Sequence, residues 1–270
     1  MKTKSPYVVK AGAKFRLKDW PTDDTGKFKT EEEVADELKR HCGKLDALQD
    51  VLSADGKHAL LIVLQAMDTG GKDGTIRHIF TGVNPQGVDV TAFKVPTPLE
   101  AAHDYLWRVH AAVPRLGMIG IFNRSHYEDV LVTRVHKTIT EKTAKRRFRE
   151  INHFEEMLVR NNVTILKFFL HISHKEQTAR LKARCEEKDK HYKISESDFH
   201  ERRYWDKYQQ AYEDAIGATS QKHSPWFVIP SDHKWYRNLA ISRIITEALQ
   251  GMNLKYPKPA FDVSKVCGEL

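Results

Sequence analysis

Residues 58–75 place a glycine-rich loop with one lysine directly after a continuous apolar segment. Residues 59–64 read Ala-Leu-Leu-Ile-Val-Leu, and such an unbroken run is typical of a strand buried on both faces. The glycines around Lys72 let backbone N–H groups approach an anion, and a helix begun near residue 73 would direct its dipole at the same anion. The pattern therefore predicts a phosphate-binding loop with the candidate ligands Thr69, Gly70, Gly71, Lys72, Asp73, Gly74 and Thr75.

This loop matches the Walker A pattern G-x-x-x-x-G-K-[ST] only in part. Ala66 stands at the first glycine position, and Asp73 stands where a metal-binding hydroxyl is expected. We still expect phosphate binding, because the loop follows a buried strand, opens a helix and keeps the glycine-lysine step. Asp68 inside the loop would repel phosphate unless a cation lies between them, so it is our candidate ligand for a Mg²⁺ cofactor. The alternative for these residues is a purely structural turn.

A second group of polar residues follows the apolar segment 118–122. Asn123, Arg124 and Glu128 come directly after it, and open α/β sheets bind ligands at the carboxyl ends of their strands. Asn123 stands where a Walker B strand has Asp and carries no charge, so metal binding would depend on Asp68, with Glu128 as a further candidate. Arg124 could clamp a phosphate through two hydrogen bonds. A surface salt bridge for Arg124 and a dipole-favoured acid for Glu128 are the alternatives.

Alternating strand and helix patterns must position these two groups. We expect strands at residues 59–67, 87–95, 118–122, 163–172 and 226–229. Helices are expected between them, at residues 98–113, 125–136, 141–160 and 234–250, and a first helix opens with a Thr30–Glu33 capping box and ends near Gly56. This alternation predicts an α/β fold in which a parallel five-stranded sheet is flanked by helices on both faces.

The chain is expected to form one domain over residues 1–270, with two appended features. Residues 1–29 mix polar residues with a few aromatic ones and suggest an N-terminal arm packed on the body. Residues 174–217 carry two long charged helical patterns without a strand, and we interpret them as a helical lid.

Composition indicates a soluble cytoplasmic protein with an anionic partner. The apolar content of 40% over 270 residues is enough for a core, while no apolar segment is long enough to span a bilayer or to act as a signal segment. Cys42, Cys185 and Cys267 form no C-x-x-C pair, which disfavours disulfides and zinc. The net charge of +8 favours an anionic partner, but we expect no nucleic acid, since no RNP or zinc-finger motif occurs, and no membrane.

Five motifs in order along residues 40–252 resemble those of the type 2 polyphosphate kinases. They are Leu-Gln-Ala-Met-Asp-Thr-Gly-Gly-Lys-Asp-Gly-Thr-Ile (64–76), Ile-Phe-Asn-Arg-Ser-His-Tyr-Glu-Asp-Val (121–130), Lys-Phe-Phe-Leu-His-Ile-Ser (167–173), Tyr-Trp-Asp-Lys-Tyr (204–208) and Ile-Pro-Ser-Asp-His-Lys-Trp-Tyr-Arg-Asn (229–238). The resemblance implies a three-layer P-loop kinase fold similar to that of thymidylate kinase.

The same resemblance implies an activity and a set of site residues. The activity is Mg²⁺-dependent phosphoryl transfer between inorganic polyphosphate and a nucleotide, without a covalent phospho-enzyme, in a homo-oligomer. The Asn-Arg-Ser-His-Tyr-Glu form is similar to the subgroup that phosphorylates both nucleoside mono- and diphosphates. The residues at matching positions are Asp68, Lys72, Asn123, Arg124 and Glu128 in the core, and Arg184, Lys190 and Lys193 in the lid; Arg77 and Lys94 are further candidate phosphate ligands.

The sequence departs from the family's motifs at two places. Ala66 replaces a glycine and is compatible with the loop only if its φ is negative. In the lid, residues 187–193 (Glu-Lys-Asp-Lys-His-Tyr-Lys) replace Asp-Pro-x-Lys-x-Trp-Lys, which changes the turn and its aromatic residue.

Three alternatives stay open from the sequence, two for the function and one for the mechanism. The chain could be an ATP-dependent nucleoside or nucleotide kinase, or a non-catalytic polyanion-binding module with a relic P-loop. A phosphohistidine intermediate at His126 is chemically possible but not required, because an acceptor phosphate is already deprotonated at neutral pH and needs no general base.

Overall fold

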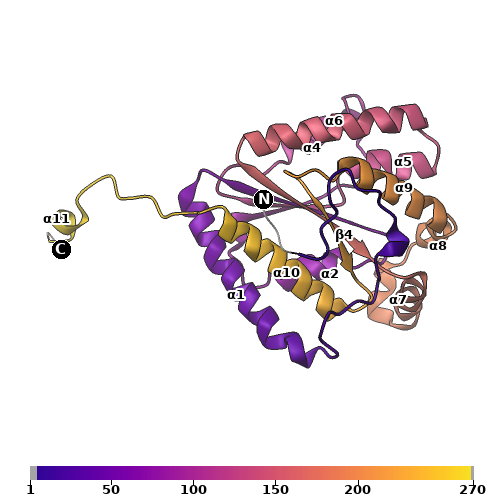
Figure 1. The fold of residues 1–270 in the computed structure, drawn as a ribbon, viewed down its shortest axis with the longest axis horizontal. Helices are drawn as coiled ribbons and strands as arrows, with labels where there is room; N and C mark the ends of the chain where they lie inside the picture. The colour runs from indigo at the N-terminus through magenta and orange to yellow at the C-terminus, as the bar shows by residue number, and fades with distance from the viewer. Residues whose placement is uncertain (1–4, 269–270) are drawn as a thin grey trace.

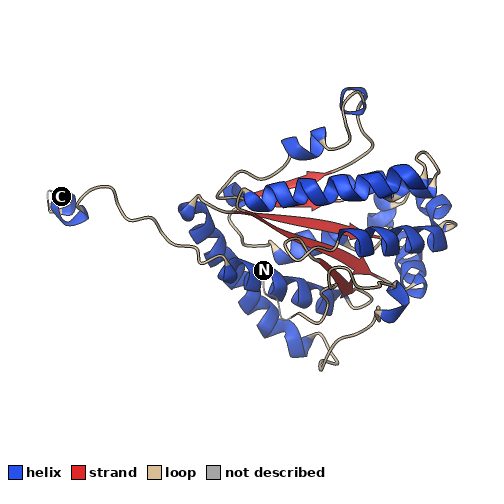
Figure 2. Ribbon diagram, turned by 45° about the horizontal axis from the view of Figure 1, so that its top comes forward, coloured by secondary structure: helices blue, strands red, loops and turns tan. Residues whose placement is uncertain are grey.

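The computed structural model describes residues 5–268, in which two helical layers enclose one parallel β-sheet (Figures 1 and 2). The strands are β1 (Ala59–Ala66), β2 (Val88–Ala92), β3 (Ile119–Asn123), β4 (Val163–His171) and β5 (Trp226–Pro230). They lie in the order β2-β3-β1-β4-β5, and every neighbouring pair is parallel. The predicted α/β fold with a five-stranded parallel sheet is confirmed.

The helices have the following bounds. The α-helices are α1 (Glu32–Asp55), α2 (Lys72–Ile79), α3 (Pro98–Ala101), α4 (Trp107–Ala111), α5 (Val132–Val135), α6 (Glu141–Arg160), α7 (His174–Glu186), α8 (Glu196–Arg202), α9 (Trp205–Thr219), α10 (Lys234–Gly251) and α11 (Val263–Cys267). The 3₁₀ helices are η1 (Leu17–Asp19), η2 (Pro85–Gly87), η3 (His126–Val130) and η4 (Lys188–Lys193). Within residues 5–268, no helix is both long and apolar enough to cross a membrane.

Strand β1 is buried on both faces, as its unbroken apolar sequence predicts. Leu60 and Ile62 belong to the core cluster that includes side chains of α1 and α10. Leu61 and Val63 point the other way, into the cluster that includes side chains of α6 and α9. The sheet thus holds two hydrophobic cores together, and its central strand carries the glycine-rich loop at its end.

Several helix predictions are wrong in detail. The Thr30–Glu33 capping box does not form: Glu31 is the N-cap of α1 and makes no side-chain capping bond, while the Glu33 carboxylate accepts the Lys29 N–H at 2.8 Å. The end of this helix is as predicted, because its C-cap, Gly56, has a left-handed φ of 61°.

Two segments predicted as single helices are each interrupted. Residues 98–113 split into α3 and α4, because the Asp104 carboxylate accepts the Leu106 N–H at 2.9 Å and forms a turn. Residues 125–136 split into η3 and α5, because Leu131 leaves helical geometry (φ −109°, ψ −82°) where this segment buries its side chains against the sheet. Neither turn has a periodicity signal in the sequence.

The segments expected as arm and lid differ in how they pack. In the arm, the Val9 N–H donates to Trp226 O at 2.8 Å and the Val228 N–H donates to Tyr7 O at 2.9 Å, so the arm covers the open edge of β5; residues 1–4 lie outside the described range. In 174–217, the expected second helix is divided into α8 and α9, and α9 packs in the core through buried side chains such as Tyr212.

A fully buried ion pair lies between α6 and β4. The Lys167 ammonium donates to the Glu155 carboxylate at 2.5 Å, to the Tyr127 hydroxyl at 3.0 Å and to Thr219 O at 2.7 Å. Burial alone would raise the pKa of Glu155, but Lys167 and His126 outweigh it and lower this pKa to about 2. All three ammonium protons are therefore used inside the protein.

We expect Glu155→Leu to lower the free energy of unfolding by about 3–5 kcal/mol, because it leaves a buried ammonium without its counter-charge. Glu155→Leu combined with Lys167→Met should recover most of this loss. Urea denaturation at neutral pH measures both, with Glu156→Ala on the exposed side of α6 as the control. Because the folded-state pKa of Glu155 is lowered, its contribution is present above pH 4.5 and is lost as the pH falls toward about 2. A loss below about 1 kcal/mol in the single variant would contradict this role.

Candidate active site

The loop between β1 and α2 has a backbone that few residue types can adopt. Thr69 and Gly71 have left-handed φ values of 63° and 96°. A Cβ on Gly70 would lie 2.4 Å from the Cβ of Ala66, so residue 70 must be glycine. Ala66 itself ends strand β1 and has no positive φ, which meets the condition for replacing a glycine there.

The carbonyl oxygens of this loop are held by side chains from two distant helices. Gln177 of α7 donates to Asp68 O at 3.2 Å, and Arg180 of the same helix donates to Thr69 O at 3.0 Å. Arg237 of α10 donates to Gly70 O at 3.4 Å. With its carbonyls bound in this way, the loop can present N–H groups to an anion at the start of α2, where helical N–H groups lack internal partners.

Sequence reasoning missed Gln177, Arg180 and Arg237 as site residues. Gln177 and Arg180 are three residues apart, so they share a face of α7, but that spacing does not tell what the face contacts. Arg237 lies within the motif 229–238, at the start of a helix that mixes polar and apolar residues, so the composition of the helix does not single it out.

A cleft of about 900 Å³ opens over the loop. Its lining includes most of the predicted site residues: Asp68, Thr69, Gly70, Gly71, Lys72, Asp73, Gly74, Lys94, Asn123, Arg124, Arg184, Lys190 and Lys193. Arg180, Lys234 and Arg237 add basic groups, while Glu176 and Asp198 are the further acidic ones. Nine basic side chains face four acidic ones, so the cleft favours an anion.

Three predicted residues are not among those that line this cleft. Thr75 is buried, and its hydroxyl donates to Gly71 O at 3.0 Å, so it holds the end of the loop from inside the protein. Arg77 is exposed on α2. Burial raises the pKa of Glu128 in η3, although the charges of Arg124 and Lys72 oppose this rise; with the Gln65 amide nitrogen assigned to its side, Gln65 donates to Glu128 Oε1 at 3.0 Å.

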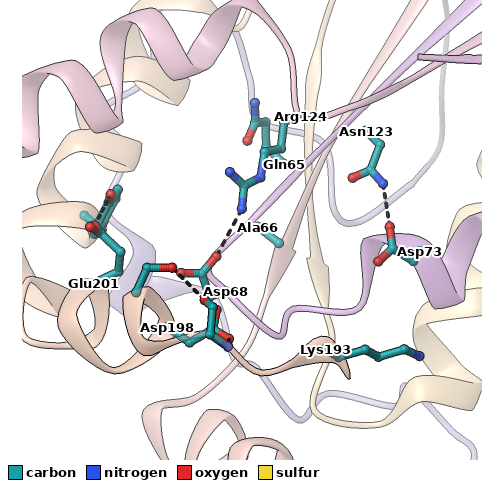
Figure 3. A network of polar contacts seen from close by, with 12 residues as sticks. Gln65, Ala66, Asp68, Asp73, Asn123, Arg124, Lys193, Asp198 and Glu201 are labelled. Carbon is teal, nitrogen blue, oxygen red and sulfur yellow. Dashed lines mark hydrogen bonds and ion pairs between the residues drawn. The ribbon is translucent and has the colours of Figure 1, made fainter. Parts of the chain in front are cut away.

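Two polar contacts join the loop to the end of β3 (Figure 3). The Arg124 guanidinium lies 3.4 Å from the Asp68 carboxylate, and the Asn123 amide donates to Asp73 at 2.5 Å. Arg124 has a positive φ of 61°, a conformation that costs energy outside glycine and is found at functional sites. Burial and the neighbouring Arg124 lower the pKa of Lys72.

His126 does not reach this cleft. Its ring is buried and lies 3.5 Å from the Glu155 carboxylate, on the core side of η3. A histidine nucleophile would need an open path to the phosphate. The geometry therefore gives no support to a phosphohistidine intermediate.

Comparison with known proteins decides which P-loop proteins this chain is related to. A family model described as "Polyphosphate kinase 2 (PPK2)" matches residues 28–257. The chain belongs to the polyphosphate kinase 2 family. It is 49% identical to "AMP/ADP-polyphosphate phosphotransferase" of Meiothermus ruber, over 96% of this chain and 98% of the relative. It is 40% identical to "ADP-polyphosphate phosphotransferase" of Rhodopseudomonas palustris, over 96% of this chain and 93% of the relative.

A solved structure shows the same fold. The crystal structure of polyphosphate kinase 2 from Arthrobacter aurescens TC1 matches with a TM-score of 0.95 and 41% identity, over 98% of this chain and 96% of that one. The P-loop kinase fold expected from the motifs is thus confirmed, and the chain is an enzyme, a polyphosphate kinase.

In this polyphosphate kinase we expect Gly71→Ala to lower kcat/KM by about tenfold or more, which corresponds to about 1.4 kcal/mol. The added Cβ would lie 2.1 Å from Arg237 Nη1 and would hold a φ of 96° that disfavours alanine. Gly43→Ala in α1 is the matched control, since its Cβ would meet nothing within 4 Å. Steady-state kinetics of both variants make the comparison. Equal kinetics in Gly71→Ala and the wild type would show that the loop tolerates a side chain.

Proposed function

We propose that this enzyme transfers phosphoryl groups between inorganic polyphosphate and nucleotides, and that it accepts both AMP and ADP. The observation that carries the proposal is the cleft, in which a phosphate-binding loop continues into a row of basic side chains suited to a repeating polyanion. The name of the Meiothermus ruber relative, "AMP/ADP-polyphosphate phosphotransferase", supports the choice of both nucleotides.

Within the predicted lid 174–217, the segment from the end of α7 through α8 is proposed to act as the lid over the polyphosphate, because α9 packs in the core. Arg184, Lys190 and Lys193 line the cleft from α7 and η4. Two of these groups have partners within the lid. Arg184 donates to Lys193 O at 3.0 Å, and Lys190 forms an ion pair with Glu187. A bound polyphosphate would compete for these cations, which would draw the lid toward the loop.

Catalysis in this proposal is positioning and electrostatic stabilisation. The loop N–H groups and Lys72 bind the transferred phosphoryl group, and Arg124, oriented by Asp68, neutralises the charge that develops on it. The acceptor oxygen of AMP or ADP carries no proton at neutral pH, so no residue needs to act as a base.

Magnesium is the proposed cofactor, with Asp68 as its protein ligand. Within residues 5–268 no group of three or more acidic, histidine or cysteine side chains could hold a metal alone. This fits Mg²⁺, which binds through one or two carboxylates together with substrate phosphates. Bound there, the ion would neutralise phosphate charge and offset the repulsion between Asp68 and the substrate.

We further propose that the enzyme is a cytoplasmic homo-oligomer. Free cysteines at positions 42, 185 and 267 support a reducing compartment. Exposed apolar side chains support an interface between copies: Val90 on edge strand β2, Val95 and Leu99 are 52%, 89% and 64% exposed.

The decisive experiment incubates AMP or ADP separately with long-chain polyphosphate and Mg²⁺, and identifies the products by chromatography. We expect ADP and ATP from AMP, and ATP from ADP. Phosphorylation from ATP but not from polyphosphate would support an ordinary nucleotide kinase instead. Binding of polyphosphate without turnover would support a non-catalytic polyanion-binding module.

Two substitutions test the site assignment. Lys72→Ala and Asp68→Asn should each lower kcat by roughly 10²–10³, as expected when a group that stabilises transition-state charge is removed. Asp68→Asn should also require more Mg²⁺ for half-maximal rate, because it has lost the metal's carboxylate. Lys44→Ala on the exposed side of α1 is the control for a lost lysine. Rates near that of the wild type in both site variants would refute the assignment.

A further inference from the structure

The loop between β5 and α10 joins the arm to α7 through the side chain of Asp232. Its Oδ2 accepts a hydrogen bond from the Thr22 hydroxyl of the arm at 2.8 Å. Its Oδ1 accepts the backbone N–H of Ser173 at 2.8 Å. Ser173 is the N-cap of α7, and its hydroxyl accepts the Glu176 N–H at 3.0 Å. One carboxylate thus fixes the arm and the first turn of α7 to each other.

The backbone of the same loop extends this connection to the P-loop. The Asp232 N–H donates to Thr22 O at 3.0 Å, so the arm and the loop bond in both directions. Arg180, two turns along α7, donates to Ser231 O at 2.6 Å and to Asp232 O at 3.3 Å. Its other terminal nitrogen donates to Thr69 O at 3.0 Å. Residues 231–232 therefore bind α7 at its N-cap, Ser173, and again at Arg180. Arg180 also reaches the phosphate-binding loop.

We propose that the N-terminal arm sets the position of α7 and, through Arg180, the conformation of the P-loop, with Thr22 and Asp232 as positioning residues. Neither side chain is among those that line the cleft, so both act through α7. Thr69, whose carbonyl accepts the last hydrogen bond in this chain of contacts, holds a left-handed φ of 63°, a conformation that persists only where its surroundings enforce it. Loosening α7 would release that restraint and displace Arg184, which the same helix carries into the cleft.

The arm has other anchors, which makes the link testable without detaching it. Its Tyr7 hydroxyl lies 2.6 Å from the Tyr236 hydroxyl, and its Val9 N–H donates to Trp226 O at 2.8 Å. Thr22→Val removes only the hydroxyl and keeps the shape of the side chain. Tyr7→Phe is the matched control, because it removes an arm hydroxyl that bonds to Tyr236 of α10 and to Asp24 of the arm, and not to the Asp232 carboxylate.

The experiment measures native-state hydrogen exchange in the intact chain, together with the KM for polyphosphate and kcat with ADP. In Thr22→Val we expect exchange in the first turns of α7 to rise about tenfold, as for the loss of a hydrogen bond to a carboxylate. Exchange in β1 should be unchanged. We also expect the KM for polyphosphate to rise several-fold with a smaller change in kcat. Thr22→Ser should restore both, and Tyr7→Phe should change neither.

Two results would overturn the proposal. One is unchanged α7 exchange in Thr22→Val; the other is an equal rise in α7 and β1, or in Tyr7→Phe, since that would reflect general destabilisation. The kinetic part rests on the proposed function, whereas the exchange part does not. A wild-type protein without polyphosphate turnover would therefore contradict the proposed function and leave exchange to decide the role of the arm.

Discussion

A phosphate-binding loop works only if its carbonyl oxygens are held away from the anion. In this kinase, helices α7 and α10 meet this constraint by placing Gln177, Arg180 and Arg237 against three successive carbonyls. The order of the sheet makes it possible, because β4 and β5, the strands that precede these helices, both lie on the same side of β1. The fold thus controls the backbone of residues 68–70 through these two helices, through the loop at 231–232 and through the arm that binds this loop.

The departures from the Walker motifs are matched by contacts between the residues concerned and their neighbours. Asp73 stands where a hydroxyl is expected and Asn123 where a carboxylate is expected, and the two side chains bond to each other at 2.5 Å. The contact between the start of α2 and the end of β3 is thus made by an acid and an amide, where the Walker motifs would place a hydroxyl and an acid. Ala66 is similarly compensated, since its methyl group occupies the space that a side chain at Gly70 would need. Each departure looks like a defect when it is considered alone. In the structure, however, Asp73 bonds to Asn123, and Ala66 packs against Gly70.

The sequence alone predicts what depends on local pattern. The strands, the loop after β1 and the polar group after β3 follow from apolar runs and glycine spacing, and parallel topology then brings the two groups to one edge. It does not predict which face of a helix meets the loop, so Gln177, Arg180 and Arg237 were missed. It also overstates candidates chosen by charge alone, such as Arg77, because whether an exposed base faces the cleft is a tertiary property.

Two buried cations among residues 5–268, Lys167 and Arg237, distinguish a structural charge from a functional one. Lys167 is neutralised by Glu155, so nothing remains for a ligand to bind. Arg237 is equally buried, and the hydrogen bonds of its guanidinium within residues 5–268 all end on the neutral oxygens of Asn238 and Gly70. Burial and Arg180 lower its pKa to about 9, which still leaves it charged at neutral pH. A buried cation without a counter-charge is costly, and a polyanion in the adjoining cleft would supply that counter-charge. The position of Arg237 beside the cleft therefore favours an anionic ligand there.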